Sequence, residues 1–409
     1  MILALLACTP KTAPPSDTAQ DWGCGGPIYV AMAGYDDDDP ELADRHAEVF
    51  GAAPDPYHLH VSWYDEPSTS MAVVWRTDGD TLATQVEYGV DETYGTTVDG
   101  ASFFVGLDQV NGRAHEARLC GLSPGTTYHY RVGGDGHWSA DHAFTTAPTP
   151  GVSTPFVFAL VGDSRGNQDT FATVLDQMDT HAPDFYLFTG DAVDIGVDME
   201  EWDAWFDAGI DHFESRPLLF THGNHEFQTQ NFYALIAAPG NEQWFSLDYA
   251  DAHFAVLNDT VARDGDMDVQ ATWLQEDLAG TSARWKFATH HQSAYSSCTT
   301  HGSNLEVRKL WSPIEEANGV VMDLAGHNHN YERSVPLSGG VETTPETGTT
   351  YIVAAGAGAD LYGNDLANSF TAVAASTEHY AIVSIADGTL TLTTYDLAGN
   401  VIDTFSTTR

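Results

Sequence analysis

The sequence predicts two consecutive domains, an all-β sandwich followed by an α/β domain that has two sheets flanked by helices. Between residues 56 and 148, short segments alternate apolar and polar residues and are separated by Gly, Asp and Pro turns, which is typical of a β-sandwich. From residue 154 to residue 409, continuous apolar runs alternate with helical segments, which is typical of an α/β sheet buried on both faces. The 409 residues are enough for both domains.

The first 21 residues favour a lipoprotein-like signal followed by a tether. A short apolar run ends at Cys8, which would become the lipidated first residue of a bacterial lipoprotein. The usual basic residues before such a run are missing, so an ordinary exported or frayed terminus is the alternative. Residues 9–21, rich in Pro, Thr, Ser and Ala, are predicted to form the flexible tether.

Residues 22–55 are predicted to form an N-terminal extension with one short helix. Asp39 can cap this helix, Pro40 suits its first position, and Gly51 suits its end. The acidic run Asp36–Asp39 is interpreted as a solvated face or a helix-dipole partner rather than a calcium site.

The charge balance is strongly acidic, with 59 Asp and Glu residues, 15 Lys and Arg residues, and a formal net charge of -44 at pH 7. Such a surface repels phosphate backbones, so nucleic acid is not expected as a partner. No apolar run approaches the roughly 18 residues of a membrane-spanning helix. An exported protein is expected, either a cell-envelope lipoprotein with a lipid anchor at Cys8 or a secreted protein. The oligomeric state stays open.

Four cysteines occur in the chain. If Cys8 carries lipid, Cys24, Cys120 and Cys298 remain, so at most one disulfide forms and its pairing stays open.

The strands of the predicted sandwich are set by alternating apolar and polar residues. They cover residues 58–64, 70–77, 84–90, 115–122, 127–134 and 142–148. Residues 147–155, rich in Pro and Thr, form the predicted linker.

The second domain has six continuous apolar runs, which we expect to be buried strands. They cover residues 156–163, 185–191, 217–224, 253–259, 285–291 and 320–327. Helices are expected at 168–180, 199–213, 268–279 and 305–318. Segments near 351–356, 379–385 and 389–406 return to β character and are expected to complete a second sheet.

Polar side chains follow five of these buried runs. The ends read Gly162-Asp163-Ser164-Arg165, Gly190-Asp191, Gly223-Asn224-His225-Glu226, His290-His291 and Gly326-His327-Asn328-His329. One polar strand end is usually a cap or a turn, but five ends rich in Asp, Asn and His indicate one shared metal site at the carboxyl edge of the sheet. Carboxylate, amide oxygen and imidazole suit borderline divalent metals, and a carboxylate such as Asp191 can bridge two of them.

The ordered set GD…GD…GNHE…H…GHxH resembles the motifs of the calcineurin-like metallophosphoesterases, and GHNHNYER at 326–333 resembles their purple acid phosphatase branch. The segment HHQSAYSSCTTHGSNLEVRKLW at 290–311 resembles bacterial members. GLSPGTTYHYRV followed by FTTAP resembles a fibronectin type III module, as found at the N-terminus of plant-type purple acid phosphatases. The resemblance implies a fibronectin type III-like domain over 56–148 and a metallophosphoesterase domain over 154–409.

The resemblance also implies two metal ions, divalent or of mixed valence, with Fe, Zn or Mn as candidates. The first metal would be held by Asp163, Asp191 and His329, and the second by Asp191, Asn224, His290 and His327. His225 would be the general acid or a phosphate contact. His290 is preferred over His291 as the ligand because of its distance from Trp285 along the strand.

Further residues would contact the substrate if the resemblance holds. His291 would then contact substrate or cap the turn, and His301 would reach the phosphate or remain an ordinary surface histidine.

Two residues depart from the family pattern. Arg165 stands where the broad family commonly has a metal-binding His, and Asp194 stands where purple acid phosphatases have the Tyr that binds iron. The resemblance therefore implies no tyrosinate–iron colour and a first metal with fewer protein ligands or a substitute one. Arg165 is expected to clamp phosphoryl oxygens, with an ion pair to Asp194 as the alternative.

These motifs predict hydrolysis of small phosphoesters by a metal-activated water, that is, a phosphomonoesterase of the acid phosphatase type. A phosphodiesterase acting on nucleotides or phospholipid head groups is one alternative. A surface module that binds metal or glycan without turnover is another. The P-loop pattern is absent from the sequence, which argues against a P-loop NTPase.

Overall fold

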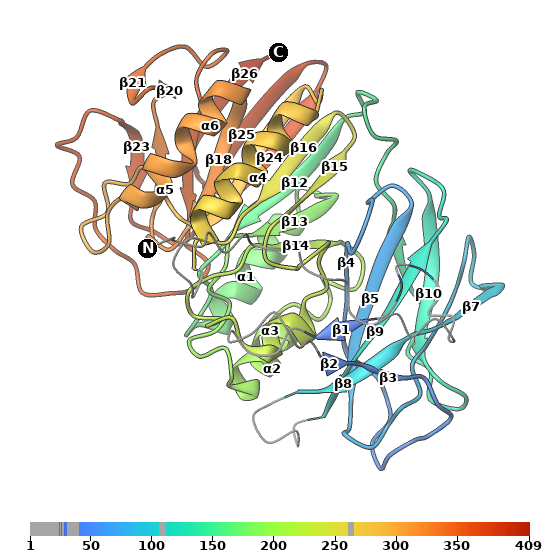
Figure 1. Cartoon of the computed structure of the whole chain (residues 1–409). Helices are drawn as coiled ribbons and strands as arrows, with labels where there is room; N and C mark the ends of the chain where they lie inside the picture. The colour runs from blue at the N-terminus through green and yellow to red at the C-terminus, as the bar shows by residue number, and fades with distance from the viewer. Residues whose placement is uncertain (1–23, 25, 27, 31–40, 106–111, 261–265) are drawn as a thin grey trace, which may run out of the picture.

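The structure is a computed structural model, and it describes residues 24, 26, 28–30, 41–105, 112–260 and 266–409. The predictions for Cys8, for the tether at 9–21 and for Asp36–Asp39 lie outside these residues. Figure 1 shows the N-terminal β domain beside the larger α/β domain, which runs from green to red.

The N-terminal domain is a β-sandwich, as predicted. One layer contains β3 (Asp44–Arg45), β4 (Tyr57–Ser62), β5 (Ser70–Thr77), β8 (Ala101–Phe104) and β9 (Arg113–Cys120). The other contains β6 (Gln85–Gly89), β7 (Thr96–Asp99), β10 (Thr127–Gly133) and β11 (His142–Thr145). Strand β7 was not predicted from the sequence, because its residues are mostly exposed and do not alternate between apolar and polar types.

The short helix predicted between Pro40 and Gly51 is wrong. The segment instead contains β2 (Glu41–Leu42), paired with β1 (Tyr29–Val30), and then β3, paired with β8. Arg113, 69 positions away, donates a hydrogen bond of 2.8 Å to Oδ2 of Asp44. These partners are distant in the sequence, and their pairing overrides the local capping signals.

The two domains share one sheet. Strand β14 (Leu218–Phe220) of the second domain lies parallel to β4, with Leu218 opposite Ser62. The resulting eleven-stranded sheet has the order β26-β25-β24-β12-β13-β14-β4-β5-β9-β8-β3. Nearby, Oγ of Ser62 donates 2.9 Å to the carbonyl of Ala237, and Val61 N–H donates 3.0 Å to the carbonyl of Phe213. The backbone of the first domain is therefore tied directly to that of the second.

The α/β domain has two sheets, as predicted. The shared sheet contributes β12 (Phe156–Val161), β13 (Phe185–Phe188), β14, β24 (His379–Ala386), β25 (Thr389–Asp396) and β26 (Val401–Thr408). The second sheet contains β15 (Phe245–Tyr249), β16 (Ala252–Val256), β17 (Trp285–Gln292), β18 (Val320–Gly326), β19 (Tyr331–Ser334), β22 (Thr350–Ala354) and β23 (Thr371–Ala375). Between the sheets, Phe158 packs edge-on against Phe254, and Phe254 stacks on Phe287.

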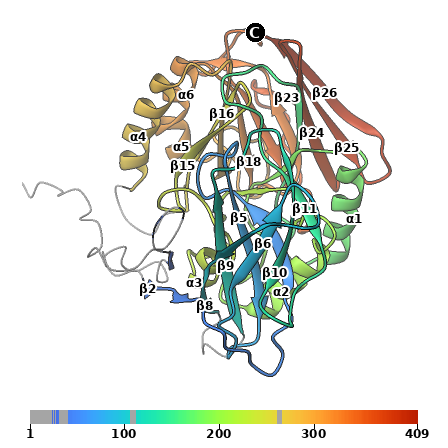
Figure 2. The same cartoon turned by 90° about the vertical axis from the view of Figure 1, so that its right-hand side faces the viewer.

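Helices cover the outer faces of both sheets, as Figures 1 and 2 show. The shared sheet packs against α1 (Gln168–Asp179), α2 (Met199–Ala208) and α3 (Gln230–Leu235). The second sheet packs against α4 (Asp266–Gly280), α5 (Leu305–Leu310) and α6 (Ser312–Asn318). None of the helices in the described ranges is long and apolar enough to cross a membrane.

Parallel pairing brings the polar strand ends together. Strands β12, β13 and β14 are parallel to one another, and so are β16, β17 and β18. Because parallel strands present their carboxyl ends at one edge of a sheet, the loops that follow them meet there.

Candidate metal centre

Three polar residues at the strand ends adopt left-handed backbone conformations. The φ angles are 61° for Asp163, 59° for Asp191 and 66° for His327. Non-glycine residues adopt this region rarely, and such strain concentrates at functional sites. Here it turns each side chain sharply out of its strand direction and into the space between the two sheets' edges.

Two glycines at the strand ends, Gly326 before His327 and Gly223 before Asn224, are required by close approach. A Cβ on Gly326 would lie 2.4 Å from Oδ2 of Asp163, and one on Gly223 would lie 2.4 Å from Oδ1 of Asp191. Any larger residue would collide with these carboxylates. The repeated Gly-Asp, Gly-Asn and Gly-His dipeptides therefore have a packing reason.

Asp163, Asp191 and His329 form a buried first group whose ligand atoms lie within 4.8 Å of one another. Nε2 of His329 lies 3.4 Å from Oδ1 of Asp163. Its Nδ1–H donates a 2.7 Å hydrogen bond to the carbonyl of Asp360. This bond fixes the ring so that Nε2 faces the carboxylates.

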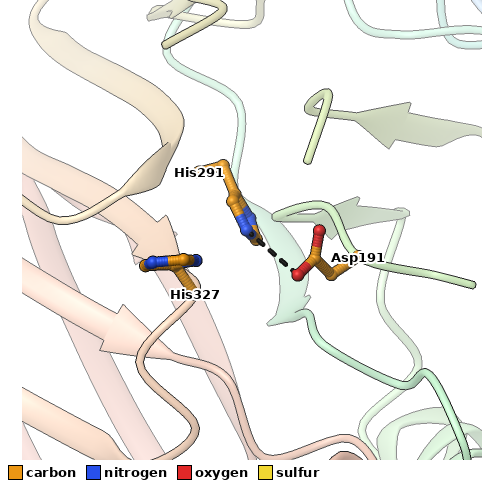
Figure 3. A group of neighbouring side chains, drawn as sticks. All are labelled: Asp191, His291 and His327. Carbon is orange, nitrogen blue, oxygen red and sulfur yellow. Dashed lines mark ion pairs between the residues drawn. The ribbon is translucent and has the colours of Figure 1, made fainter. Parts of the chain in front are cut away.

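Asp191, His291 and His327 form a second group, again with ligand atoms within 4.8 Å of one another. Figure 3 shows the Asp191 and His291 side chains directed at each other, with the His327 ring beside them. Nε2 of His291 lies 3.3 Å from Oδ2 of Asp191 and 3.1 Å from Oδ1 of Asn224. Its Nδ1–H donates 2.7 Å to the carbonyl of Thr189, which leaves Nε2 for the site.

The charge states of the two histidines differ. Burial lowers the pKa of His327 to about 2, with His291 and His301 adding to the effect, so this ring is neutral and ready to bind a metal. Burial also lowers the pKa of His291, but Asp191 outweighs it and raises that pKa to about 10. A metal ion bound beside Asp191 would displace this proton.

The structure does not place His290 in this centre, contrary to the sequence-based expectation. Nε2 of His290 lies 3.1 Å from Oδ2 of Asp323, and its Nδ1 lies 3.4 Å from Oδ2 of Asp259. His291 occupies the position expected for His290.

The period of the strand explains this exchange. Trp285 and Phe287 lie in the core between the two sheets. His291 is an even number of residues further along the strand, so its side chain faces the same side of the sheet. His290 lies on the opposite face, where its ring contacts Trp311 edge-on. The spacing from Trp285 therefore favours His291 once the inward face of the strand is known.

His225 lies at the rim of the centre, with 26% of its side chain exposed. Its backbone N–H donates 2.9 Å to Oδ1 of Asp191. Its Nδ1–H donates 2.7 Å to the carbonyl of Asp194, and Nε2 lies 4.0 Å from Oδ2 of Asp191. The Nε2 atom therefore lies on the side of the donor groups, at a partly exposed position.

Arg165 makes the ion pair that the sequence left as the alternative. Its Nη1 donates 2.6 Å to Oδ1 of Asp194. Its Nε lies 3.6 Å from Oδ2 of Asp191, and its Nη2 lies 3.4 Å from Nε2 of His329. The guanidinium thus pairs with Asp194 at the border of the first group.

Sequence reasoning missed the role of Glu226. Its buried carboxylate accepts hydrogen bonds from the backbone N–H groups of Asp191 (3.0 Å), Ala192 (2.8 Å) and Gly223 (2.8 Å). Glu226 therefore ties the loop after β13 to the loop after β14. Its place directly after Asn224-His225 was the available signal.

Two aromatic rings border the centre. His301 lies with its ring 4.4 Å from that of His327. Tyr362, which no sequence pattern singled out, stacks on His329 at 4.1 Å and lies 5.4 Å from His301. The loop after β22 thus places the Tyr362 ring beside the centre, and hydrophobic periodicity in the sequence does not predict this contact.

Comparison with known families decides the identity. Residues 56–146 match the N-terminal domain of purple acid phosphatases, and residues 156–331 match the calcineurin-like phosphoesterases. The chain carries a calcineurin-like metallophosphoesterase domain after a purple acid phosphatase N-terminal domain. The conformations and contacts described above fall on the motifs that carry this resemblance.

Relatives of this metallophosphoesterase include plant and mycobacterial proteins. Purple acid phosphatase 21 of Arabidopsis thaliana is 27% identical over 307 residues, which are 69% of this chain and 67% of the relative. Fe(3+)-Zn(2+) purple acid phosphatase 12 of the same plant is 25% identical over 343 residues, 76% of this chain and 71% of the relative. The uncharacterized protein Rv2577 of Mycobacterium tuberculosis is 26% identical over 340 residues, which are 71% of this chain and 64% of the relative.

Solved structures share the fold. A purple acid phosphatase from yellow lupin (Lupinus luteus) seeds has a TM-score of 0.74 at 19% identity and covers 91% of this chain and 77% of its own. The structure of PhoD has a TM-score of 0.66 at 13% identity, and the match covers 86% of this chain and 93% of the PhoD chain.

The calcineurin-like phosphoesterase domain and the purple acid phosphatase relatives indicate a phosphoester hydrolase. Carboxylate and imidazole donors meet in two overlapping groups, with the Asn224 amide oxygen beside them, and this donor set fits a dinuclear metal centre. Asp191 belongs to both groups, as a bridging ligand must.

Proposed function

We propose that the chain is a phosphomonoesterase that acts on small phosphoesters. The observation that carries this proposal is the pair of overlapping donor groups with His225 at their rim. The first metal would be held by Asp163, Asp191 and His329. The second would be held by Asp191, Asn224, His291 and His327, with His291 replacing His290 in the ligand set.

The two metal ions would lower the pKa of a bound water and neutralise charge on the phosphoryl oxygens. The residues of the chain supply the rest. Asp163 and Asp191 receive backbone N–H groups from His327 and His225, which hold the carboxylates in place. Glu226 fixes the backbone on either side of Asp191.

His225 is proposed as the general acid. The hydrogen bond from Nδ1–H to the Asp194 carbonyl orients the ring, so that a proton held at Nε2 points toward the leaving oxygen. Oδ2 of Asp191 lies 4.0 Å from Nε2, which places the ring beside the donor groups. Arg165 and His301 are proposed as substrate contacts, because both side chains border the donor groups.

The substrate class follows from charge. The formal net charge of -44 disfavours extended polyanions, so a small ester is a better substrate than a nucleic acid. The remaining choice, monoester or diester, needs measurement.

The test compares nitrophenyl phosphate with bis-nitrophenyl phosphate on the full chain, with metal content measured in the same samples. We expect a higher kcat/KM for the monoester, and loss of both turnover and at least one metal in Asp191→Ala. Asp169→Ala, an exposed carboxylate in the first turn of α1, is the matched control and should change neither. A higher kcat/KM for the diester would contradict the monoesterase proposal and support a phosphodiesterase. A metal-loaded protein that hydrolyses neither ester would support a binding module without turnover.

We infer that the protein is exported. The disulfide between Cys24 and Cys120 supports this, because such bonds persist in oxidising compartments. The lipid anchor at Cys8 stays a prediction. Labelled fatty acid incorporated by the full chain but not by Cys8→Ser would establish the anchor, and equal labelling of both would exclude it.

A further inference from the structure

A second polar cluster lies on the opposite face of β17 from the metal centre. It contains His290, Asp259, Glu315 and Asp323, whose side chains are all fully buried. His290 comes from β17, Asp323 from β18, Glu315 from α6, and Asp259 from the segment after β16. Apolar side chains of the cluster around Trp311 surround it, and the Trp311 ring lies 5.5 Å from that of His290.

The carboxylates in this cluster have unused ligand atoms. Both oxygens of Glu315, Oδ1 of Asp323 and Oδ1 of Asp259 are buried and have no hydrogen-bond partner among the described residues. The ion pairs found for Asp259 and Asp323 in the described part of the chain are both with His290. Three acidic side chains facing one imidazole are costly to bury without a further cation, because each charge loses its hydration.

The geometry matches a metal site. One ligand atom each from His290, Glu315 and Asp323 lies within 4.8 Å of the others. Nε2 of His290 and Oδ2 of Asp323 are 3.1 Å apart. Two ligand atoms that bind one ion at about 2.1 Å lie about 3–4 Å apart, so these atoms need only small shifts to share a metal.

Asp259 supplies the outer support that metal-binding histidines require. Its Oδ2 lies 3.4 Å from Nδ1 of His290 and accepts a 2.5 Å hydrogen bond from the Gln292 N–H. In the structure Nδ1 of His290 lies beside this carboxylate without a hydrogen bond to it. With a metal at Nε2, the proton of the ring would be at Nδ1 and Asp259 would be its acceptor, which is the usual partner of a metal-binding histidine.

We propose that His290, Glu315 and Asp323 bind a third divalent cation, with Asp259 orienting His290. One imidazole and two carboxylates suit zinc or manganese better than calcium, which prefers oxygen ligands alone. The site is closed by apolar side chains, so the ion is structural and not catalytic. It joins α6 to β17 and β18 and thereby braces the strand that presents His291 to the other face.

The test uses crystals and metal analysis of the full chain purified with zinc or manganese. Anomalous diffraction at the metal edge should show a third peak between His290 and Glu315, apart from the two peaks at Asp191. Metal analysis should give three ions per chain for the wild type and two for Glu315→Gln. Glu316→Gln, on the same helix but outside the cluster, should keep three.

The result that would overturn the proposal is two ions per chain with no peak beside Glu315. The cluster would then hold a proton shared between the carboxyl groups of Glu315 and Asp323. Because the wild-type map decides this alone, a failure of Glu315→Gln to fold does not affect the outcome. Loss of the peaks at Asp191 with retention of the third would show that the two sites load independently.

Discussion

At the scale of single residues, the proposed chemistry depends on side chains that one hydrogen bond fixes in direction. His291, His329 and His225 each donate Nδ1–H to a backbone carbonyl, of Thr189, Asp360 and Asp194 respectively. Each ring therefore presents Nε2 to a carboxylate of the donor groups. The difference in their roles comes from position, because His225 is partly exposed and the other two are buried.

His225→Asn should leave both metals bound and slow the hydrolysis of esters with poor leaving groups by about 10²–10⁴, the usual effect of losing a positioned acid. Nitrophenyl esters should be affected less, since their leaving groups need little protonation. The measurement is kcat for a series of esters of rising leaving-group pKa. An equal loss across the series would assign His225 to phosphate positioning instead.

Arg165 sits where a clamp and an ion pair are both possible, because Asp194 holds its guanidinium next to His329. Arg165→Ala should lower kcat/KM by about 10²-fold if the guanidinium stabilises charge on the phosphoryl group. The Tm should change little, since a partly exposed ion pair contributes weakly to stability. An unchanged kcat/KM with a lower Tm would limit Arg165 to the pair with Asp194.

At the scale of elements, ion pairs as well as apolar packing fasten helices to the second sheet. His253 on β16 bonds to Asp248 on β15 and Asp277 on α4, both at 2.8 Å. Burial alone lowers the pKa of His253, but these two hydrogen bonds outweigh it and raise that pKa to about 9.

The raised pKa predicts a pH-dependent contribution to stability. His253 is protonated in the folded state up to about pH 9, whereas in the unfolded chain it loses its proton near 6.5. Its stabilisation is therefore full below pH 6.5 and is lost as the pH rises through 9. His253→Gln should lower the free energy of unfolding by about 1–3 kcal/mol at pH 6. At pH 10 the ionic contribution of His253 is already absent from the wild type, so the substitution should lower the free energy of unfolding much less.

Denaturant unfolding at several pH values measures this difference. His60→Gln is the control, because burial lowers the pKa of His60 to about 4 and the ring stays neutral in the folded protein. Its effect should be constant between pH 8 and 10. A constant effect for His253→Gln over the same range would contradict the imidazolium assignment.

At the scale of the whole molecule, the two domains form one folded body. The shared sheet runs through β14 and β4, and the disulfide between Cys24 and Cys120 fastens the N-terminal segment to the end of β9. Among the described cysteines, the buried Cys298 takes no part in a disulfide, which agrees with the expected limit of one bond.

Cys120→Ser should lower the free energy of unfolding by about 2–5 kcal/mol, because the bond closes a long loop of the unfolded chain. The two cysteines are 96 positions apart. Reducing agent should lower the Tm of the wild type to that of the variant and leave the variant unchanged. Cys298→Ser should retain the response to reducing agent, and a variant that still responds after loss of Cys120 would place the effect elsewhere.

The sequence by itself determined the main buried strands of the second domain and the chemical groups that follow them. The apolar runs predicted β12, β13, β14, β16, β17 and β18, because buried strands have a local signature that needs no partner. The Gly-Asp, Gly-Asn-His and Gly-His-Asn-His ends named the donors, because polar residues after buried strands gather at one edge of a sheet.

Tertiary structure alone decided which atoms meet. Pairing with β8 made a strand of Asp44–Arg45, inside the segment predicted to be helical, and the inward face of β17 selected His291 over His290. The choice of Asp194 as the partner of Arg165, the backbone bonds of Glu226 and the contact of Tyr362 with His329 were likewise not settled by any local pattern. The physical reason is common to all: periodicity and turn chemistry act over a few residues, whereas each of these contacts joins segments that only folding brings together.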